Sequence, residues 1–302
     1  MEVWTLGSCV ELMSLTVFPV QPDEGLKRRV KEHWEKDPCA IRYADCADRD
    51  IVHAFADVDQ RLYEQDYMRA EFAAFAKARD KKVLEVGLGV GSDLLSWARA
   101  GADVCGVDLT EASVNLIRRR LMAEGLSAQV MVGDAENLPF PDSHFDIFYS
   151  WGVLHHTPDT EKAMRQAWRV LKPGGTLKLM LYHYPSVFAY LIWMLYGPLK
   201  GKFVNPRKIV FDHLESPGTK AFTEDEVQEM LARTLVHGTP QTVKIQPYLA
   251  SADLLTFELS DKYRGRKWQI IRQIYPRKLV KLLVGDKFGF FMTVEAVKPQ
   301  FQ

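Results

Sequence analysis

The chain has 302 residues, with 39 basic and 39 acidic side chains, so its formal net charge is zero. Such a chain lacks the global positive field that holds a nucleic-acid backbone, which argues against a nucleic-acid modifier. A hydrophobic content of 47% is ample for a sizeable core, yet no stretch approaches the ~20 apolar residues of a membrane span.

The cysteines and the first residues bear on the compartment. Four cysteines show neither paired zinc-ligand spacing nor a secreted disulfide framework, and an acid follows Met1 where a signal peptide carries basic residues. We therefore expect a cytoplasmic protein without a bound metal.

The N-terminal part of the chain, residues 1–80, is expected to form an arm and a helical cap. Residues 1–24 show no clear period and are interpreted as a mobile arm or as a strand lent to a partner, which leaves a homodimer open. Residues 26–34 have a helical pattern, and Trp34 is followed by Pro38 and Cys39. Residues 51–78 then predict one or two helices.

The most informative stretch is glycine-rich. An apolar run, 83–86, encloses Glu85 and is typical of a strand buried in a parallel sheet. Gly87, Gly89 and Gly91 follow at intervals of two, which permits a tight turn and a close approach of the backbone to a ligand. A glycine-rich loop alone is weak evidence, because several cofactor sites use related loops.

Further strands alternate with helices after this loop. The pattern predicts a doubly wound, mostly parallel α/β sheet, whose ligands bind at the carboxyl ends of the strands. The second predicted strand ends in Asp108, 23 residues after Glu85, where an acid can accept hydrogen bonds from both hydroxyls of a ribose. The predicted strands are 102–108, 128–132, 145–152 and 177–182, and the predicted helices are 92–100, 111–124 and 159–171.

These ordered motifs resemble the class I S-adenosylmethionine-dependent methyltransferases that act on small molecules. The resemblance is close over residues 82–182 and loose over residues 27–302, a range that includes the expected core, 81–302, and the Trp34–Pro38–Cys39 spacing. It implies a Rossmann-like sheet of seven strands with the last one antiparallel, completed by 242–247 and 288–297. The implied cofactor is S-adenosylmethionine, held by Glu85, Gly87, Gly89, Gly91, Asp108, Leu109, Asp134, Ala135 and Ser150.

The resemblance also suggests how parts of the chain act. The N-terminal helices would close over the cofactor, with Arg61 or Tyr63 reaching its methionine end. His155 and His156 follow the fourth strand, and one of them could remove a proton from the methyl acceptor, since imidazole titrates near neutrality. A structural role for these histidines remains the alternative, and Tyr182 is the next catalytic candidate.

Two segments lie outside the seven-stranded sheet and the helices that alternate with its strands. Residues 183–222 are expected to form a lid, because 187–196 is apolar on nearly every face, rich in aromatic residues and too short to span a bilayer. Residues 251–286 form a predicted helical insertion with a basic cluster, interpreted as a solvated helix face.

The aromatic lid favours a small apolar or aromatic metabolite as acceptor, methylated on oxygen or nitrogen. Methylation of a carbon in a prenyl-type alkene is one alternative, because aromatic faces could stabilise a cation. A cofactor-binding scaffold without transfer activity is the other.

Overall fold

The computed structural model describes residues 24–41, 44, 50–201, 204–214, 216–234, 242–256 and 265–300. The arm expected over residues 1–24 therefore lies almost wholly outside the described residues, as do Lys262 and Arg264 of the basic cluster. Within the described ranges, no helix combines the length and the apolar character that crossing a membrane requires.

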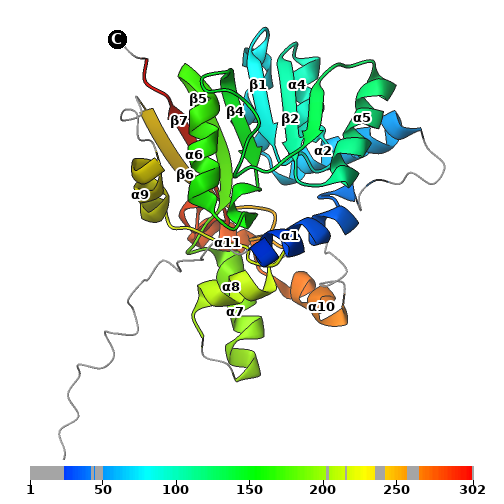
Figure 1. Cartoon of the computed structure of the whole chain (residues 1–302). Helices are drawn as coiled ribbons and strands as arrows, with labels where there is room; N and C mark the ends of the chain where they lie inside the picture. The colour runs from blue at the N-terminus through cyan, green and yellow to red at the C-terminus, as the bar shows by residue number, and fades with distance from the viewer. Residues whose placement is uncertain are drawn as a thin grey trace, which may run out of the picture.

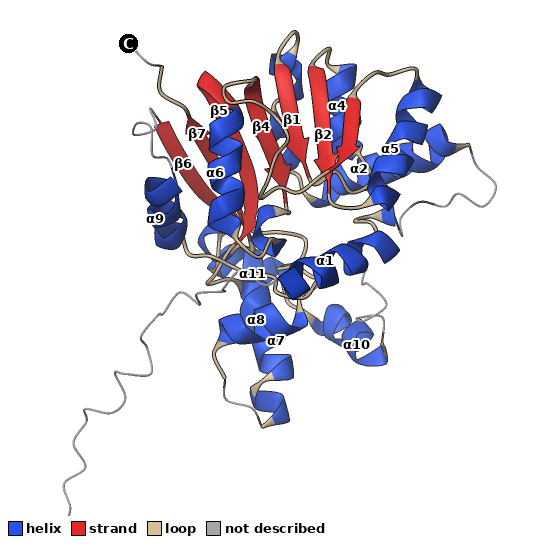
Figure 2. Ribbon diagram, viewed as in Figure 1, coloured by secondary structure: helices blue, strands red, loops and turns tan. Residues whose placement is uncertain are grey.

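A seven-stranded sheet forms the centre of the molecule, in the order β3-β2-β1-β4-β5-β7-β6 (Figure 2). The first five strands are parallel, whereas β7 runs antiparallel to both β5 and β6. This confirms the prediction of a mostly parallel sheet with a reversed last strand. The strands are β1 (Lys82–Val86), β2 (Asp103–Asp108), β3 (Gln129–Val132), β4 (Phe145–Trp151), β5 (Leu171–Tyr182), β6 (Thr242–Tyr248) and β7 (Phe291–Val297).

Helices cover both faces of this sheet because its central strands are apolar on both sides. Val83 belongs to a core cluster shared with α4 and α5, whereas its neighbour Leu84 belongs to a second cluster shared with α6 and α9. The helices are α4 (Ser92–Arg99), α5 (Glu111–Glu124), α6 (Thr160–Val170) and α9 (Glu224–Thr234).

Local sequence signals set the helix starts. Thr110 caps α5 by accepting from the Ser113 backbone N–H, as its position before the helix predicts. At α9, Thr223 accepts from the Glu226 backbone N–H while the Glu226 carboxylate accepts from the Thr223 N–H. This reciprocal pair is a capping box.

Strand β5 begins six residues earlier than the apolar run 177–182 indicates. Leu171 already pairs with Phe145, but the next pair is Thr176 with Ile147, so the register shifts between them. Gly174 takes a positive φ of 79° in this irregular stretch. The alternation of side chains is interrupted there, which is why the sequence pattern reveals only the regular second half of the strand.

Most of the remaining helices lie toward the carboxyl ends of the parallel strands (Figures 1 and 2), whereas the short turn Phe75–Ala78 leads into the start of β1. The N-terminal group consists of α1 (Glu24–Lys36), α2 (Ile51–Gln65), α3 (Arg69–Ala73) and η3 (Phe75–Ala78). The later part of the chain adds α7 (Val187–Tyr196), η5 (Pro198–Lys200), α8 (Pro206–His213), α10 (Arg266–Ile274), α11 (Arg277–Leu283) and η7 (Asp286–Phe288). Of these, α7, α8 and α10 lie lowest in Figure 1. The short η4 (Leu154–His156) follows β4.

Candidate functional site

A cavity of about 460 Å³ lies at the carboxyl ends of β1, β2, β4 and β5. Its wall combines the loops after these strands with residues of α1, the end of α2, the start of α3 and the start of α7. This volume is in the range of small-molecule and cofactor sites. The position agrees with the general rule for doubly wound sheets.

The glycine-rich loop forms one side of the cavity and tolerates no side chain there. Gly87 and Gly89 both line the cavity with positive φ angles of 81° and 52°. A Cβ on Gly87 would lie 2.1 Å from a methyl carbon of Val153, and one on Gly89 would lie 3.3 Å from Cys39. Glycine therefore allows the loop to turn and to pack against Val153 and Cys39, and it leaves the backbone without side chains where the loop lines the cavity.

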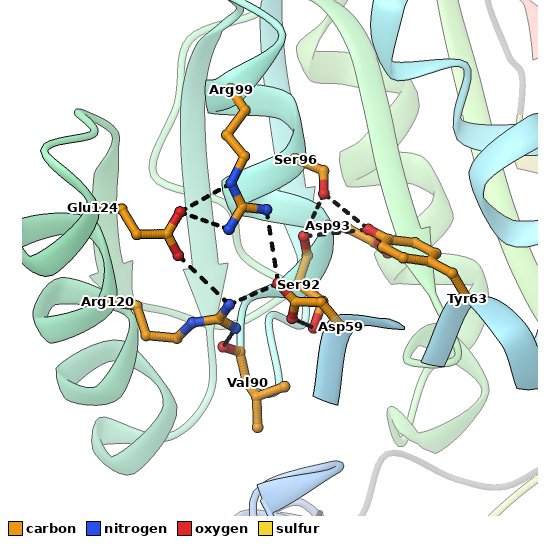
Figure 3. A network of polar contacts seen from close by, with 9 residues as sticks. All are labelled: Asp59, Tyr63, Val90, Ser92, Asp93, Ser96, Arg99, Arg120 and Glu124. Carbon is orange, nitrogen blue, oxygen red and sulfur yellow. Dashed lines mark hydrogen bonds and ion pairs between the residues drawn. The ribbon is translucent and has the colours of Figure 1, made fainter. Parts of the chain in front are cut away.

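A buried polar network holds the end of this loop in place (Figure 3). Asp59 of α2 accepts a hydrogen bond from the Ser92 hydroxyl at 2.6 Å and an ion-paired one from Arg120 at 2.8 Å. Arg120 also donates to the carbonyl oxygen of Val90 at 2.8 Å and is 1% exposed. The network thus ties α2 and α5 to the loop and fixes the floor of the cavity.

The carboxylate of Asp108 lies where β2 ends and lines the cavity. It accepts from the Leu88 backbone N–H at 2.7 Å and from the backbone N–H and hydroxyl of Thr110 at 2.9 and 2.6 Å. These donors orient both oxygens, and a carboxylate has about four acceptor positions, so it can still take hydroxyl donors of a ligand. Leu109, Asp134 and Ala135 line the same side of the cavity.

Helix α1 lies across this polar side and is fastened at two points. Near its start, Lys27 donates to Asp134 and Glu136, both at 2.8 Å. Near its end, the Glu35 carboxylate accepts from the backbone N–H groups of Glu111 and Ala112 at 3.1 and 2.8 Å, at the positive N-terminus of α5. The helix therefore bridges the loop after β3 and the start of α5.

Arg69 is a cavity residue that the sequence analysis did not identify. Its guanidinium forms a bidentate pair with Asp93 on α4, with N–O distances of 2.7 to 3.1 Å. Tyr63 and Tyr149 donate to the same carboxylate at 2.9 and 2.8 Å. Arg69 is held beside the glycine-rich loop by this pair. No spacing in the sequence links α3 to α4, so no signal pointed to Arg69.

The other half of the cavity is lined mainly by rings and aliphatic groups. It includes Trp34 of α1, Phe188 of α7 and residues at the ends of β4, β5 and β7. A mostly apolar wall favours an apolar ligand, because polar groups would lose hydration there without gaining partners. The ring-bearing residues on this wall are Trp34, Trp151, His156, Tyr182, Phe188, Phe290 and Phe291.

The two neighbouring histidines have different positions. His156 lines the cavity, and its Nδ1 lies 2.8 Å from the Ser216 hydroxyl oxygen and 3.0 Å from that of Thr219. Burial lowers the pKa of His156 to about 3, so its imidazole is neutral at physiological pH. His155 is absent from the cavity wall and stacks on Tyr182 with ring centroids 3.9 Å apart.

His155 is also buried, with neither ring nitrogen hydrogen-bonded to any part of the chain that the structure describes. Burial lowers the pKa of His155 well below its ordinary value. Of the pair, only His156 is therefore in a position to meet a molecule in the cavity.

Three further predicted site residues lie behind the wall. Gly91 is the N-cap of α4, with a φ of 88°, and Ser150 donates to the Val86 carbonyl oxygen at 2.8 Å. Glu85 is 2% exposed, and burial, then the neighbouring Asp93, raises its pKa well above the ordinary value. These residues shape β1, β4 and the start of α4 but do not face the cavity.

The lid and the N-terminal helices contribute fewer contacts than expected. Of the aromatic residues in α7, only Phe188 lines the cavity, while Tyr190 is 42% exposed. Tyr63 is engaged with Asp93 and Ser96, and neither it nor Arg61 is on the cavity wall. Trp34, Pro38 and Cys39 all reach the wall, in line with the spacing noted in the sequence.

Comparison with known proteins places residues 84–179 in a family described as "Methyltransferase domain". The chain is 34% identical to "Methyltransferase GfsG" of Streptomyces halstedii, over 46% of this chain and 49% of that protein. It is 36% identical to "Ubiquinone/menaquinone biosynthesis C-methyltransferase UbiE" of Laribacter hongkongensis, over 41% and 53% of the two chains. The matches thus span about half the length of these curated relatives.

A solved structure has the same fold over nearly the whole chain. The geranyl diphosphate C-methyltransferase of Streptomyces coelicolor A3(2) superposes with a TM-score of 0.56, covering 92% of this chain and all of that one. The sequence identity is 15%. The matched residues therefore form a methyltransferase domain at the centre of the chain, and the fold over nearly its whole length is that of the solved structure.

Proposed function

We propose that this protein transfers a methyl group from S-adenosylmethionine to a small, apolar or aromatic metabolite. The observation that carries the proposal is the division of one cavity into two chemically different halves. The glycine-rich loop and the acids after β2 and β3 form a polar half, and the ring-bearing side chains form an apolar half. The cavity is suited to hold a nucleoside-bearing cofactor beside an apolar acceptor.

The residues of the polar half fit the cofactor. Asp108 would accept from the two ribose hydroxyls, Leu109 would pack on the adenine ring, and Asp134 would accept from the adenine amino group. Arg69, next to the loop, would face the methionine end. Gly87 and Gly89 present backbone without side chains where the loop lines the cavity. When bound, the cofactor supplies an electrophilic methyl group on a sulfonium.

The residues of the apolar half would position the acceptor and exclude water. Positioning alone contributes several kcal/mol to a displacement reaction. His156 could take the acceptor proton, since its imidazole is neutral, but its lowered pKa makes it a weak base. We therefore assign the larger share of catalysis to positioning, with His156 orienting an acceptor hydroxyl or amine.

Methylation at carbon is the second candidate. The aromatic faces of Trp34, Trp151 and Tyr182 could stabilise positive charge that develops on a prenyl or quinol-type acceptor. The UbiE relative and the geranyl diphosphate enzyme are both named as C-methyltransferases. Both candidates use the same cavity and differ in the atom that is methylated.

Incubating the protein with methyl-labelled S-adenosylmethionine and cell extract, followed by mass spectrometry of labelled products, tests the proposal. A labelled small lipophilic product is expected, and its fragmentation shows whether oxygen, nitrogen or carbon is methylated. The Asp108→Asn variant serves as the control. It should bind the cofactor more weakly, and the amount of labelled product should decrease in proportion. Cofactor binding in calorimetry without any labelled product would instead make the protein a scaffold.

A further inference from the structure

Helix α11 exposes an apolar face that no described part of the chain covers. None of its residues is buried, and Leu282 and Leu283 are 80% and 72% exposed. Leu279 lies on the same face, three and four positions earlier, and is also exposed. The preceding helix α10 ends on Ile274, which is 75% exposed. Large aliphatic side chains gathered in this way on one helix and its neighbour indicate an interaction surface.

The segment that forms this surface is one-sided in charge. Residues 265–285 contain six basic residues and no acidic one, in a chain whose charges balance overall. Lys278 and Lys281 alternate with the leucines of α11, and both are exposed. Among the residues that the structure describes, neither lysine forms an ion pair. The basic residues are Arg266, Lys267, Arg272, Arg277, Lys278 and Lys281.

We propose that α10 and α11 form a surface that docks on an anionic phospholipid bilayer. Exposed leucines flanked by lysines are typical of helices that lie in the membrane interface, where the leucines enter the acyl boundary and the lysines meet lipid phosphates. A protein partner fits less well, because lysine is depleted at protein–protein interfaces. Helix α7 also exposes apolar side chains, Tyr190 and Met194, but it has no basic residue, so it lacks this complementarity to anionic lipid.

The segment that carries α10 and α11 is hydrogen-bonded to a loop beside the apolar half of the cavity. Arg272 and Arg277 donate to the carbonyl oxygens of Leu255 and Leu254 at 3.1 and 2.9 Å. The Tyr275 hydroxyl donates to the Asp253 carbonyl oxygen at 2.7 Å. The loop that receives these bonds also carries Ser251 and Ala252, which line the cavity.

The side chain of Asp253 extends this connection. Its carboxylate accepts from the backbone N–H groups of Phe188 and Phe290, at 3.0 and 2.7 Å, and both residues line the cavity. A bilayer bound to α10 and α11 would therefore lie at a fixed position relative to the apolar wall. Lipid docking does not depend on methyl transfer and can be tested without an acceptor.

Sedimentation with vesicles measures the docking directly. The full chain is mixed with vesicles of phosphatidylcholine, with or without phosphatidylglycerol, and binding is expected mainly to the anionic vesicles and to weaken with salt. Leu282→Ala with Leu283→Ala should reduce partitioning by tenfold or more, on the order of what several buried methylenes contribute. Lys278→Gln and Lys281→Gln should each reduce binding about fivefold, on anionic vesicles only.

Matched variants elsewhere on the surface show whether the loss of vesicle binding is specific to α10 and α11 or follows from removing any exposed apolar or basic side chain. Met122→Ala removes another 80% exposed apolar side chain on α5, and Lys162→Gln removes an exposed lysine on α6. Neither should change vesicle binding, and all variants should keep the wild-type melting temperature and cofactor affinity. No binding to anionic vesicles, or equal losses in the control variants, would overturn the proposal. A dimer that the double leucine variant dissociates would assign the surface to a second copy instead.

Discussion

The ammonium group of Lys27 lies 2.8 Å from a carboxylate oxygen of Asp134, across the polar half of the cavity. Asp134 is the residue assigned to the adenine amino group, so α1 is fastened to the group that would recognise the base. Burial lowers the pKa of Lys27, but hydrogen bonds to Asp134 and Glu136 outweigh it and hold the pKa above the ordinary value. We infer that α1 covers the adenine end and that the cofactor leaves when this contact opens.

Lys27→Met should accelerate cofactor release and cost about 1–3 kcal/mol of stability, because it leaves the buried Glu136 carboxylate without its cation. Stopped-flow displacement of the cofactor and urea denaturation measure the two effects. Arg28→Met is the control on the same helix, since Arg28 makes only a long, exposed pair with Glu32. Equal release rates for both variants would show that α1 does not restrain the cofactor.

Arg69→Gln should reduce the free energy of unfolding by about 3–5 kcal/mol, because it leaves the Asp93 carboxylate buried without its cation. Arg99→Gln removes a half-exposed pair with Glu124 and should cost ~1 kcal/mol or less. Denaturation of both variants in urea gives the comparison. Similar losses would mean that Tyr63 and Tyr149 suffice to hold Asp93.

The stability should depend on His156 below pH ~6.5, the ordinary imidazole pKa. Burial lowers the pKa of His156 in the folded state to about 3, so only the unfolded state binds the proton between these values. The free energy of unfolding therefore decreases as the pH is lowered, and this group accounts for a decrease of ~2 kcal/mol from pH ~7 to pH ~5. His156→Gln should remove that part of the slope in urea titrations.

The difference between wild type and His156→Gln isolates this residue from other titrating groups. Asp253 in particular acts in the opposite direction, because burial raises its pKa to about 7. If stability depends on pH equally in the wild type and the variant, His156 binds its proton equally well in the folded and unfolded states. An ordinary histidine base would make the rate of methyl transfer fall as the pH is lowered through ~6.5. The lowered pKa of His156 predicts that the rate does not fall there.

Substitutions of Phe188 and Trp193 should distinguish the side of α7 that lines the cavity from its outer side. Phe188→Ala should cost ~3–5 kcal/mol of stability and raise KM for the acceptor found by labelling, because this ring is buried and lines the cavity. Trp193→Ala should leave that KM unchanged, since Trp193 is absent from the wall and donates instead to the Val204 carbonyl oxygen. Melting curves and acceptor titrations distinguish them, and the reverse pattern would place the acceptor against the outer side of α7.

The sequence by itself determined the sheet, the glycine-rich loop and the acids that follow β2 and β3. These features are local: Gly87 and Gly89 are required by the turn itself, and Asp108 and Asp134 follow directly from where their strands end. Parallel strands bring such ends to one edge, so a linear pattern suffices to predict that they converge.

Only the tertiary structure decided which neighbouring side chain faces the cavity and which distant ones join it. His155 and His156 are adjacent in sequence, yet the short turn η4 buries one against Tyr182 and presents the other to the cavity. Arg69 and Lys27 reach the site through pairs with Asp93 and Asp134, 24 and 107 positions away. Contacts between segments so far apart in sequence depend on packing, which leaves no period in the sequence from which to predict them.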